Sequence, residues 1–480
     1  MESFSFLIPE SRIIERLQFE NPWWRDNAIE ENYHRLPRRL YFNLLKPFLR
    51  NKNLRRAIIL LGPRRVGKTV MMHHAIQYLM DSGIKGNQII FVGIDNPIFI
   101  NTSLEQLYLH ALKASGNDSK EHYVFFDEIQ YLKNWELHLK VLVDSYPATR
   151  FIVSGSAAAA LKVGNTESGA GRFTEFLLPP LTFQEFLHLQ NLQSLVQSHQ
   201  QPVVDEDPTV YYTNDIKELN EQFFQYLNYG GYPEVIFSDA VKSNMQKFIK
   251  NDILDKVLLR DLPGLYGIRD VQELNRFFAY LAYNTGKEFS PERISRESQL
   301  DKNTIKSYLD YLEAAFLIKV IHKTDDHAKS FKRITGYKIY LTNPSLRTAL
   351  FAPVNPIDDD AGPLVETGIF AQFFHVNTLQ LHYASWQNGK SRGEVDMVFI
   401  DSIKRIPHWA CEIKWSNRAV QKPSELKSLM NYCTKNNLQK AIVTSIDKTE
   451  KVMYDGVEIN FRPAAIHAYT IAANTLTQGD

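Results

Sequence analysis

One stretch decides the fold, Gly62-Pro63-Arg64-Arg65-Val66-Gly67-Lys68-Thr69, which lies between an apolar run (Ala57 to Leu61) and a helix-like segment (Val70 to Met80). The pattern GxxxxGK(S/T) in this context is typical of a phosphate-binding loop, whose backbone N–H groups and helix N-terminus hold phosphate oxygens. Lys68 is expected to reach the β and γ phosphates, and Thr69 to ligate Mg²⁺. The flanking strand and helix argue against the alternative, a chance motif in a glycine turn. The sequence therefore predicts that Gly62 to Thr69 bind a nucleoside triphosphate.

A second strand candidate supplies the acidic groups that hydrolysis needs. Tyr123 to Phe126 is apolar and ends in Asp127-Glu128. We expect Asp127 to hold the Mg²⁺ shell opposite Thr69, and Glu128 to polarise the attacking water as a general base. An apolar run ending in two acids is a weak signal alone, because ordinary strands also end in charged turns. With a phosphate loop about 60 residues upstream, the signal becomes strong.

Two further residues are candidates for contact with the γ-phosphate. Phe151 to Val153 is a strand candidate that runs into Ser154, with Ser156 close behind. Because the carboxyl ends of parallel strands share one edge, we expect Ser154 or Ser156 beside the phosphate, although a plain strand-to-turn transition explains them equally well. Arg172 follows a glycine-bearing loop and is a candidate to stabilise phosphate charge, in cis or from a neighbouring subunit. A solvated surface arginine is the commoner case.

Length, composition and charge restrict the class of protein. A chain of 480 residues predicts two or three domains, and 44% hydrophobic with 23% charged residues is ordinary for a folded protein. A net charge of +1 excludes a globally basic nucleic-acid binder but allows local basic surfaces. Two cysteines, Cys411 and Cys433, form no disulfide framework, which suits a reducing cytosol. Without a long apolar stretch or a signal-peptide core, the expectation is a soluble cytoplasmic protein with no membrane partner.

The periodicity predicts an α/β fold in several parts. Strand candidates alternate with helical segments after the phosphate loop, which indicates a parallel sheet covered on both faces. The polar stretch Gln193 to Thr213 is expected to be a surface loop, and the residues after it are mostly helical. The expected parts are a lead-in (1–55), a nucleotide-binding core (56–190), a helical region (191–285), a winged helix (286–345) and a C-terminal α/β domain (363–480).

The prediction of a winged helix depends on two helix starts and on two strand candidates, Phe316 to Ile321 and Tyr337 to Leu341. Ser290-Pro291 begins one short helix, and Asp301 caps a second. The second helix has apolar positions at helical spacing: Ile305, Tyr308, Leu309 and Leu312. A winged helix can read DNA through this second helix. Its polar residues suited to that task are Lys302, Asn303 and Lys306, so packing against protein is an equally good alternative.

The C-terminal domain carries a second group of candidate site residues. Asp396 lies at the start of an apolar strand, and Glu412-Ile413-Lys414 follows sixteen residues later. Because side chains alternate along a strand, Glu412 and Lys414 share one face and the other face is apolar. Glu366, on the preceding predicted helix, adds a third carboxylate. Such carboxylates can hold Mg²⁺ or Mn²⁺ while a lysine activates water, although Glu-x-Lys also occurs by chance.

The motifs GPRRVGKT, FFDEIQYLKNW, VSGSAAAAL and GAGRFTEFLLPPLTFQEFL, with NPWWR, YGGYPEV and RDL, resemble one family. It comprises the AAA-type ATPases of bacteria and archaea that carry a winged helix and a C-terminal domain. The resemblance covers nearly the whole chain and implies ATP hydrolysis, with these residues in their usual roles: Lys68, Thr69, Asp127, Glu128 and Ser154. The C-terminal set is similar to the PD-(D/E)xK nuclease core, to which the family's last domain is related. The preference for adenine rests on the resemblance.

Three functions are consistent with these features. The first is an ATPase that acts on DNA, with Mg²⁺ or Mn²⁺ at a nuclease-like site formed by Asp396, Glu412 and Lys414, and with homo-oligomers as a possibility. The second is a regulatory ATPase whose C-terminal domain has lost catalysis and docks protein or DNA partners. The third is a DNA-binding module, which would leave a complete ATPase site unused.

Overall fold

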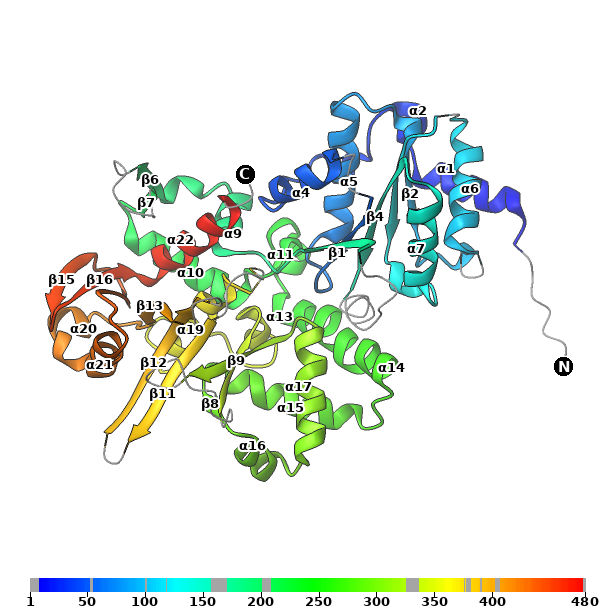
Figure 1. The fold of residues 1–480 in the computed structure, drawn as a ribbon. Helices are drawn as coiled ribbons and strands as arrows, with labels where there is room; N and C mark the ends of the chain where they lie inside the picture. The colour runs from blue at the N-terminus through cyan, green and yellow to red at the C-terminus, as the bar shows by residue number, and fades with distance from the viewer. Residues whose placement is uncertain are drawn as a thin grey trace. The chain divides into compact units, whose positions relative to one another are not determined.

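The computed structural model describes residues 8–477 apart from 52–54, 100–101, 118, 157–170, 201–208, 325–335, 375, 377–380, 389–390 and 402–405. The chain divides into two compact units, Met1–Leu178 and Pro179–Gln478, with the last two residues assigned to the first. The two units are described separately (Figure 1).

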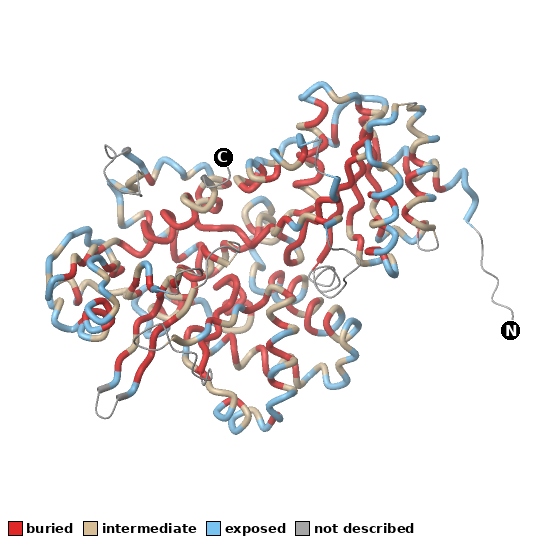
Figure 2. The backbone as a smooth tube through the Cα atoms, viewed as in Figure 1, coloured by how far each residue is buried: buried red, intermediate tan, exposed pale blue. Residues whose placement is uncertain are grey.

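The first unit is built on a parallel sheet of five strands in the order β2-β3-β4-β1-β5. The strands are β1 (Ala57–Leu61), β2 (Ile89–Gly93), β3 (His122–Asp127), β4 (Thr149–Gly155) and β5 (Phe173–Leu177). The central strands are buried along their whole length (Figure 2), as expected for parallel strands covered on both faces. The strands predicted at Tyr123–Phe126 and Phe151–Val153 are confirmed.

Helices cover both faces of this sheet. They are α5 (Lys68–Asp81), α6 (Leu104–Ser115) and α7 (Trp135–Ser145). The connection through α5 runs across the sheet from β1 to β2, whereas those through α6 and α7 run in the opposite direction. Right-handed crossovers therefore place α5 on one face and the other two helices on the opposite face (Figure 1). Ser103 caps α6, because its side chain accepts a hydrogen bond from the N–H of Gln106.

The lead-in forms four helices, α1 (Glu10–Glu20), α2 (Trp23–Asp26), α3 (Glu31–His34) and α4 (Phe42–Arg50). Asn21, between the first two, is fully buried against the edge strand β2. Its Oδ1 accepts from the N–H of Phe91 at 2.7 Å, and its Nδ2 donates to the carbonyl of Phe91 at 2.8 Å. Trp23 is buried and donates to the Ile89 carbonyl at 3.0 Å. The amide side chain thus pairs with the sheet edge as a further strand would.

The second unit contains a mixed sheet of nine strands in the order β15-β16-β14-β13-β12-β11-β9-β10-β8, and a separate two-stranded sheet. Its strands are β6 (Gln197–Gln200), β7 (Thr209–Tyr212), β8 (Glu288–Phe289), β9 (Ile318–Thr324), β10 (Tyr337–Leu341), β11 (Leu381–Asn388), β12 (Ser391–Ile400), β13 (Pro407–Glu412), β14 (Lys440–Ser445), β15 (Glu450–Tyr454) and β16 (Val457–Pro463). Its α-helices are α9 (Phe183–Leu189), α10 (Ile216–Tyr229), α11 (Pro233–Phe237), α12 (Asp239–Lys242), α13 (Met245–Phe248), α14 (Leu262–Tyr266), α15 (Val271–Tyr283), α16 (Pro291–Ser298), α17 (Lys302–Ala314), α18 (Ser345–Thr348), α19 (Ala361–Ala371), α20 (Arg418–Gln421), α21 (Lys427–Lys435) and α22 (Ala464–Thr477). Two π-helical segments, Ile249–Leu254 and Val257–Asp261, lie between α13 and α14.

The helices and strands predicted for residues 286–345 are present in the expected order. Ser290 caps α16 and Asp301 caps α17, and the apolar positions predicted for α17 are buried. Strand β9 pairs antiparallel with β10 and parallel with β11. The hairpin of this segment therefore continues the C-terminal sheet, so that β10 and β12 belong to one sheet.

The predicted apolar face of β13 is confirmed. Cys411 and Ile413 are buried in one core cluster with Phe370 of α19 and Met397 of β12. This packing leaves Glu412 on the opposite face. Sequence reasoning missed β15 and the last helix, α22, whose near-continuous apolar composition gives no helical stripe.

The prediction of a surface loop over Gln193 to Thr213 is wrong for the described part of that segment. It contains a short 3-10 helix (Gln193–Leu195) and the antiparallel pair β6 and β7. The ring of Tyr211 packs edge-on against Tyr469, with centroids 5.3 Å apart. Backbone hydrogen bonds hold the pair together, so the strands form without the alternating apolar pattern that sequence reasoning requires.

Asn21→Ala tests the lead-in's hold on the sheet edge. The change leaves the N–H and carbonyl of Phe91 buried without their partner, so the free energy of unfolding should fall by about 2–4 kcal/mol in urea denaturation. Asn43→Ala is the matched control, because Asn43 is exposed and its Oδ1 accepts a hydrogen bond from Lys46 Nζ at 2.9 Å on the surface. It should change stability by less than about 0.5 kcal/mol. Equal stabilities of the two variants would contradict the role given to Asn21.

Candidate functional site

The phosphate loop requires glycine at its first position. Gly62 has φ +154°, and a Cβ there would lie 2.2 Å from the backbone oxygen of Leu178. The N–H of Leu178 in turn donates to the Leu61 carbonyl at 2.8 Å, so the two segments cannot separate to make room. Gly67, with φ +91°, precedes the first turn of α5. The loop thus lies between β1 and the N-terminus of α5, where the sequence predicted it.

Lys68 is buried and folds back over the loop. Its Nζ donates to the carbonyls of Gly62 at 3.1 Å and of Pro63 at 2.9 Å. Arg39 of the lead-in supports the loop from another side, with its Nη1 donating to the Val66 carbonyl at 2.9 Å. The ammonium group is therefore held next to the backbone that would surround a phosphate.

Three side chains and one backbone N–H form one hydrogen-bonded network between the start of α5 and the carboxyl ends of β3 and β4. Thr69 Oγ1 donates to Asp127 Oδ2 at 2.7 Å, and Ser154 Oγ donates to the other oxygen, Oδ1. The N–H of Glu128 donates to Ser154 Oγ at 2.9 Å. Burial, and then the charge of Glu128, raise the pKa of Asp127 to about 6. The structure thus brings together the predicted residues of this site.

Glu128 is held by a residue that sequence reasoning missed. Its backbone has φ +55°, a left-handed conformation that a non-glycine residue adopts at some cost. Gln130 Nε2 donates to the Glu128 carboxylate, and Gln130 Oε1 accepts from the N–H of Ser156 at 3.2 Å. Gln130 therefore orients the predicted general base. No sequence pattern identifies Gln130 beyond its place two residues after Glu128.

Arg172 lies at the other end of the strands. Its carbonyl accepts from the N–H of Ala57, the first residue of β1, whereas the phosphate loop follows the last residue of that strand. Its Nε pairs with Asp144 Oδ1 at 2.6 Å. The structure does not bring Arg172 to the phosphate loop of its own chain, so contact with a phosphate would have to come from a neighbouring subunit; the alternative is a surface arginine, since its side chain is 42% exposed.

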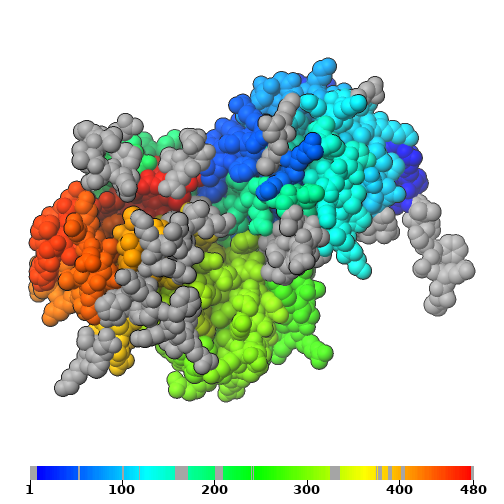
Figure 3. Space-filling view, viewed as in Figure 1, coloured from blue at the N-terminus to red at the C-terminus, as the bar shows by residue number. Residues whose placement is uncertain are grey.

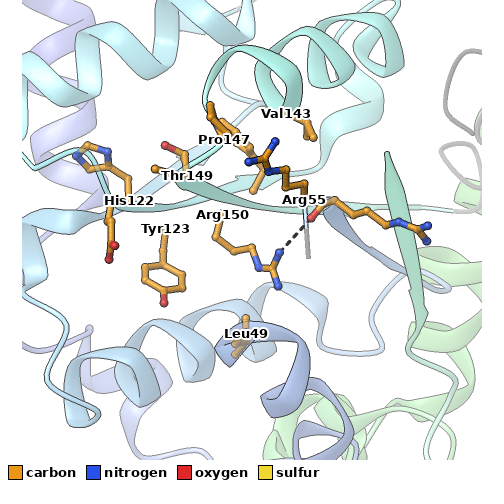
Figure 4. A pocket seen from close by; sticks show the side chains of 12 residues that line it. Leu49, Arg55, His122, Tyr123, Val143, Pro147, Thr149 and Arg150 are labelled. Atoms are coloured by element: carbon orange, nitrogen blue, oxygen red, sulfur yellow. Dashed lines mark hydrogen bonds between the residues drawn. The ribbon is translucent and has the colours of Figure 1, made fainter. Parts of the chain in front are cut away.

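A small cavity of about 130 Å³ lies at this same end of the sheet (Figure 4). Tyr123 and Arg150, near the starts of β3 and β4, are among its lining residues. Arg150 donates to the carbonyl of Arg56 at 3.4 Å and to that of Phe48 at 2.7 Å. Its guanidinium therefore ties β4 to α4 and the start of β1. The position excludes this cavity as the nucleotide site.

In the second unit, the structure brings Asp396, Glu412 and Lys414 together. Asp396 Oδ2 accepts from the N–H of Ile413 at 2.9 Å, which fixes the carboxylate beside β13. Lys414 Nζ lies 2.7 Å from Glu412 Oε1 and 3.6 Å from Asp396 Oδ2. Burial, and then the charge of Asp396, raise the pKa of Glu412 to about 8. These contacts agree with the spacing from which the site was predicted.

Glu366 is joined to this group through Lys338, which sequence reasoning missed. Lys338 Nζ lies 3.0 Å from Glu366 Oε1, 2.9 Å from Glu394 Oε1 and 3.5 Å from Asp396 Oδ1. Tyr340 donates to Glu366 at 2.5 Å. Burial lowers the pKa of Lys338, but the nearby charges, first that of Glu366, outweigh it and hold the pKa well above its usual value. The ammonium group is therefore charged.

The carboxylates of this group are chemically suited to bind a divalent cation, but they are not arranged around one position. Carboxylate oxygens are suitable ligands, and buried Glu412 Oε2 has no hydrogen-bond partner among the described residues. Across the described ranges, however, no three His, Cys, Asp or Glu residues are placed to hold one metal ion. Lys338 and Lys414 lie between the carboxylates instead. The predicted metal ligands Glu366, Asp396 and Glu412 are thus neighbours without surrounding a common point.

A cavity of about 580 Å³ opens beside these carboxylates. Glu366, Glu394 and Asp396 line it together with Lys338. Its basic lining residues are Lys287, Arg293 of α16 and Arg392 of β12. The cavity therefore places cationic side chains next to the acidic group.

Comparison with known proteins agrees with the site in the first unit. An AAA domain family (AAA_14) matches residues 54–187, and a domain of unknown function (DUF8612) matches residues 220–357. An uncharacterized protein of Haemophilus influenzae is 27% identical over 64% of this chain and 72% of its own length. The uncharacterized protein MJ1544 of Methanocaldococcus jannaschii is 24% identical over 83% of this chain and 85% of its own.

Two solved structures are also similar. The ORC2 protein of Aeropyrum pernix has a TM-score of 0.36 at 13% identity, over 68% of this chain and 92% of that one. AMPPCP-bound DnaA of Aquifex aeolicus has a TM-score of 0.28 at 16% identity, over 62% and 92%.

Residues 54–187 thus match an AAA domain family, and they contain the phosphate loop within a mixed α/β fold. Among the helices that the structure describes, none is long and apolar enough to cross a membrane.

The raised pKa of Asp127 predicts a pH-dependent stability in magnesium- and nucleotide-free buffer. Because the folded-state pKa of about 6 exceeds the ordinary value of 3.8, the native state binds the extra proton and stability falls as pH rises through this window. Asp127→Asn removes this effect, so at pH 8 the free energy of unfolding should rise by about 1–3 kcal/mol, and at pH 4 the gain should shrink.

Urea denaturation at the two pH values measures this effect. Asp144→Asn, which alters an exposed ion pair with Arg172, is the control and should stay within about 0.5 kcal/mol. A gain for Asp127→Asn that is the same at both pH values would contradict the account.

Proposed function

We propose that this protein hydrolyses ATP at its phosphate loop and uses hydrolysis to act on DNA. The observation that carries the first half is the network joining Thr69, Asp127, Glu128 and Ser154. It places a base, an acidic metal ligand and two hydroxyls at one edge of the sheet, beside a glycine loop. The preference for ATP rests on the resemblance to AAA-type ATPases and on the matching domain family.

Each residue of this site has a defined task. Lys68 exchanges its loop carbonyls for phosphate oxygens, to which it donates hydrogen bonds. Thr69 and Asp127 would hold Mg²⁺, which neutralises phosphate charge when bound. Glu128, oriented by Gln130, accepts the proton of the attacking water. Ser154 holds the backbone N–H of Glu128 and the carboxylate of Asp127 in fixed positions relative to each other.

The proposal that DNA is the partner is supported by the cavity beside Asp396. Its basic residues, Lys287, Arg293 and Arg392, suit the phosphate backbone, and the neighbouring carboxylates suit a metal ion that acts on it. The segment from α15 to β10 has the element order of a winged helix and presents a broad exposed surface in Figure 3, coloured green to yellow-green. On α17, Asn303 and Lys306 are exposed, whereas Lys302 pairs with Glu292 at 2.7 Å.

We further propose that the C-terminal part is a PD-(D/E)xK-like nuclease. Asp396 and Glu412, with Glu366, would hold Mg²⁺ or Mn²⁺, which stabilises the charge of the reacting phosphate when bound. Lys414 orients the attacking water from its place beside Glu412. The boundaries of the five parts, a homo-oligomeric state in which Arg172 acts in trans, and a cytoplasmic location stay predictions.

Two variants separate nucleotide binding from hydrolysis. Lys68→Ala removes the ammonium group that meets the phosphates and should abolish binding of fluorescent ATP. Glu128→Gln keeps the fold of the site but loses the base, so ATP should bind while phosphate release falls at least about 100-fold. Turnover in Glu128→Gln equal to that of the unchanged protein would refute the role of Glu128.

The nuclease is tested with Asp396→Asn and labelled duplex and branched DNA in Mn²⁺. Cleavage should be lost, because the charge of a proposed metal ligand is removed, while ATP hydrolysis should persist. Lys306→Gln is the control for DNA contact and should weaken retention without changing the chemistry of cleavage. If the unchanged protein cuts none of these DNAs, nuclease activity is excluded. DNA binding is then the only part of the proposed action on DNA that remains.

A further inference from the structure

The lead-in contributes a side chain to the phosphate loop, although the matching AAA family covers residues 54–187. Arg39 is 7% exposed, and its Nη1 donates to the carbonyl of Val66 at 2.9 Å. Its guanidinium lies over the ring of Tyr41, 5.4 Å from the centroid, and Tyr41 is itself buried. The loop is therefore held at Val66 by a segment that lies outside the family match.

The segment that carries Arg39 is tied to α5 on both sides. On one side, the ring of Tyr33 stacks on His73 of α5, with 3.8 Å between the centroids. On the other side, Phe42 of α4 packs edge-on against Tyr78 of α5, with centroids 5.7 Å apart. Because both anchors lie on the helix that begins at the phosphate loop, the guanidinium of Arg39 is fixed in position relative to that loop.

The peptide unit between Val66 and Gly67 is the part of the loop that depends on this contact. Gly67 has φ +91°, and glycine adopts positive and negative φ at similar energy, so this peptide unit can turn over at low cost. In a planar trans peptide, the carbonyl oxygen and the N–H point to opposite sides. A hydrogen bond that holds the Val66 carbonyl toward Arg39 therefore holds the Gly67 N–H toward the other side, where the loop would surround a phosphate.

A peptide unit that turned over would weaken the loop in two ways. It would remove the Gly67 N–H as a donor to the phosphate, and it would direct the negative end of the Val66 carbonyl toward negatively charged oxygens. Both effects act before the ligand binds, because bound phosphates hold the N–H themselves. Fixing the peptide in advance therefore lowers the cost of binding and leaves the barrier to hydrolysis unchanged.

We propose that Arg39 is a positioning residue for the triphosphate, which locks the Val66–Gly67 peptide with its N–H directed at the phosphates. The inference rests on the proposed ATP site and adds to it a residue of the lead-in. Arg39 acts through the backbone of the loop and does not itself touch the ligand. Since the group that benefits is the triphosphate, the effect is independent of the nucleoside.

Calorimetric titration of the full chain with ATP and with inorganic triphosphate measures this effect. Arg39→Gln removes the cationic donor, so the Kd for each ligand should rise by the same factor, about tenfold. The kcat at saturating ATP should stay within about threefold, because bound phosphates then hold the peptide. Arg38→Gln is the matched control, because the neighbouring arginine is 41% exposed and pairs with Asp81 at 3.7 Å. It should change neither Kd by more than about twofold.

The outcomes separate this inference from the proposed ATPase. An unchanged Kd in Arg39→Gln, an equal loss in Arg38→Gln, a loss for ATP without one for triphosphate, or a fall in kcat alone would overturn the inference and leave the ATPase intact. If the unchanged protein binds triphosphate but does not hydrolyse ATP, the proposed function fails, and the Kd for triphosphate still decides the role of Arg39. Binding of neither ligand would overturn both.

Calorimetry also separates folding from affinity, because a partly unfolded sample lowers the stoichiometry of binding and not the Kd. If Arg39→Gln does not fold, Arg39→Lys takes its place. An ammonium group keeps the charge but cannot both donate to Val66 and lie over Tyr41 as a guanidinium does, so the Kd should rise by at least about threefold. Full affinity in Arg39→Lys would then overturn the inference.

Discussion

Both candidate sites depend on the same constraint, which is that an aspartate buried in a strand must find partners inside the protein. In the first unit the partners of Asp127 are neutral hydroxyls, from Thr69 and Ser154. In the second unit, Asp396 is paired with ammonium groups, from Lys338 and Lys414. The neighbouring elements are arranged around this requirement, because residues that are far apart in the sequence must meet at the aspartate to supply the partners.

The two solutions leave the aspartates in different electrostatic states. Hydroxyls satisfy the lone pairs of Asp127 without cancelling its charge, which explains why burial raises its pKa and why a cation is needed there. Ammonium groups cancel much of the charge around Asp396 before any metal arrives. The first site is thus prepared to receive a cation with its nucleotide, whereas the second already contains part of the positive charge that it requires.

The sequence predicted the parts of the sites that are local in the chain. The phosphate loop follows from a strand, a glycine turn and a helix in succession, and the Asp127-Glu128 pair from the end of the next apolar run. Asp396 and Glu412 follow from alternation along adjacent strands. Lys338 could not be found in this way, because it reaches the carboxylates only through the parallel pairing of β9 with β11. The place of Arg172 likewise depends on the register of β5 against β1, which no local pattern records.

The parallel pairing of β9 with β11 has a consequence for how such a protein can change over evolutionary time. A chain cut between α18 and α19 would expose the edge of a strand on each side, and exposed edges promote aggregation. It would also separate Lys338 from the three carboxylates that surround it. Residues 286–345 and the C-terminal strands therefore share one sheet, and replacing either part would require rebuilding the strand edge of the other.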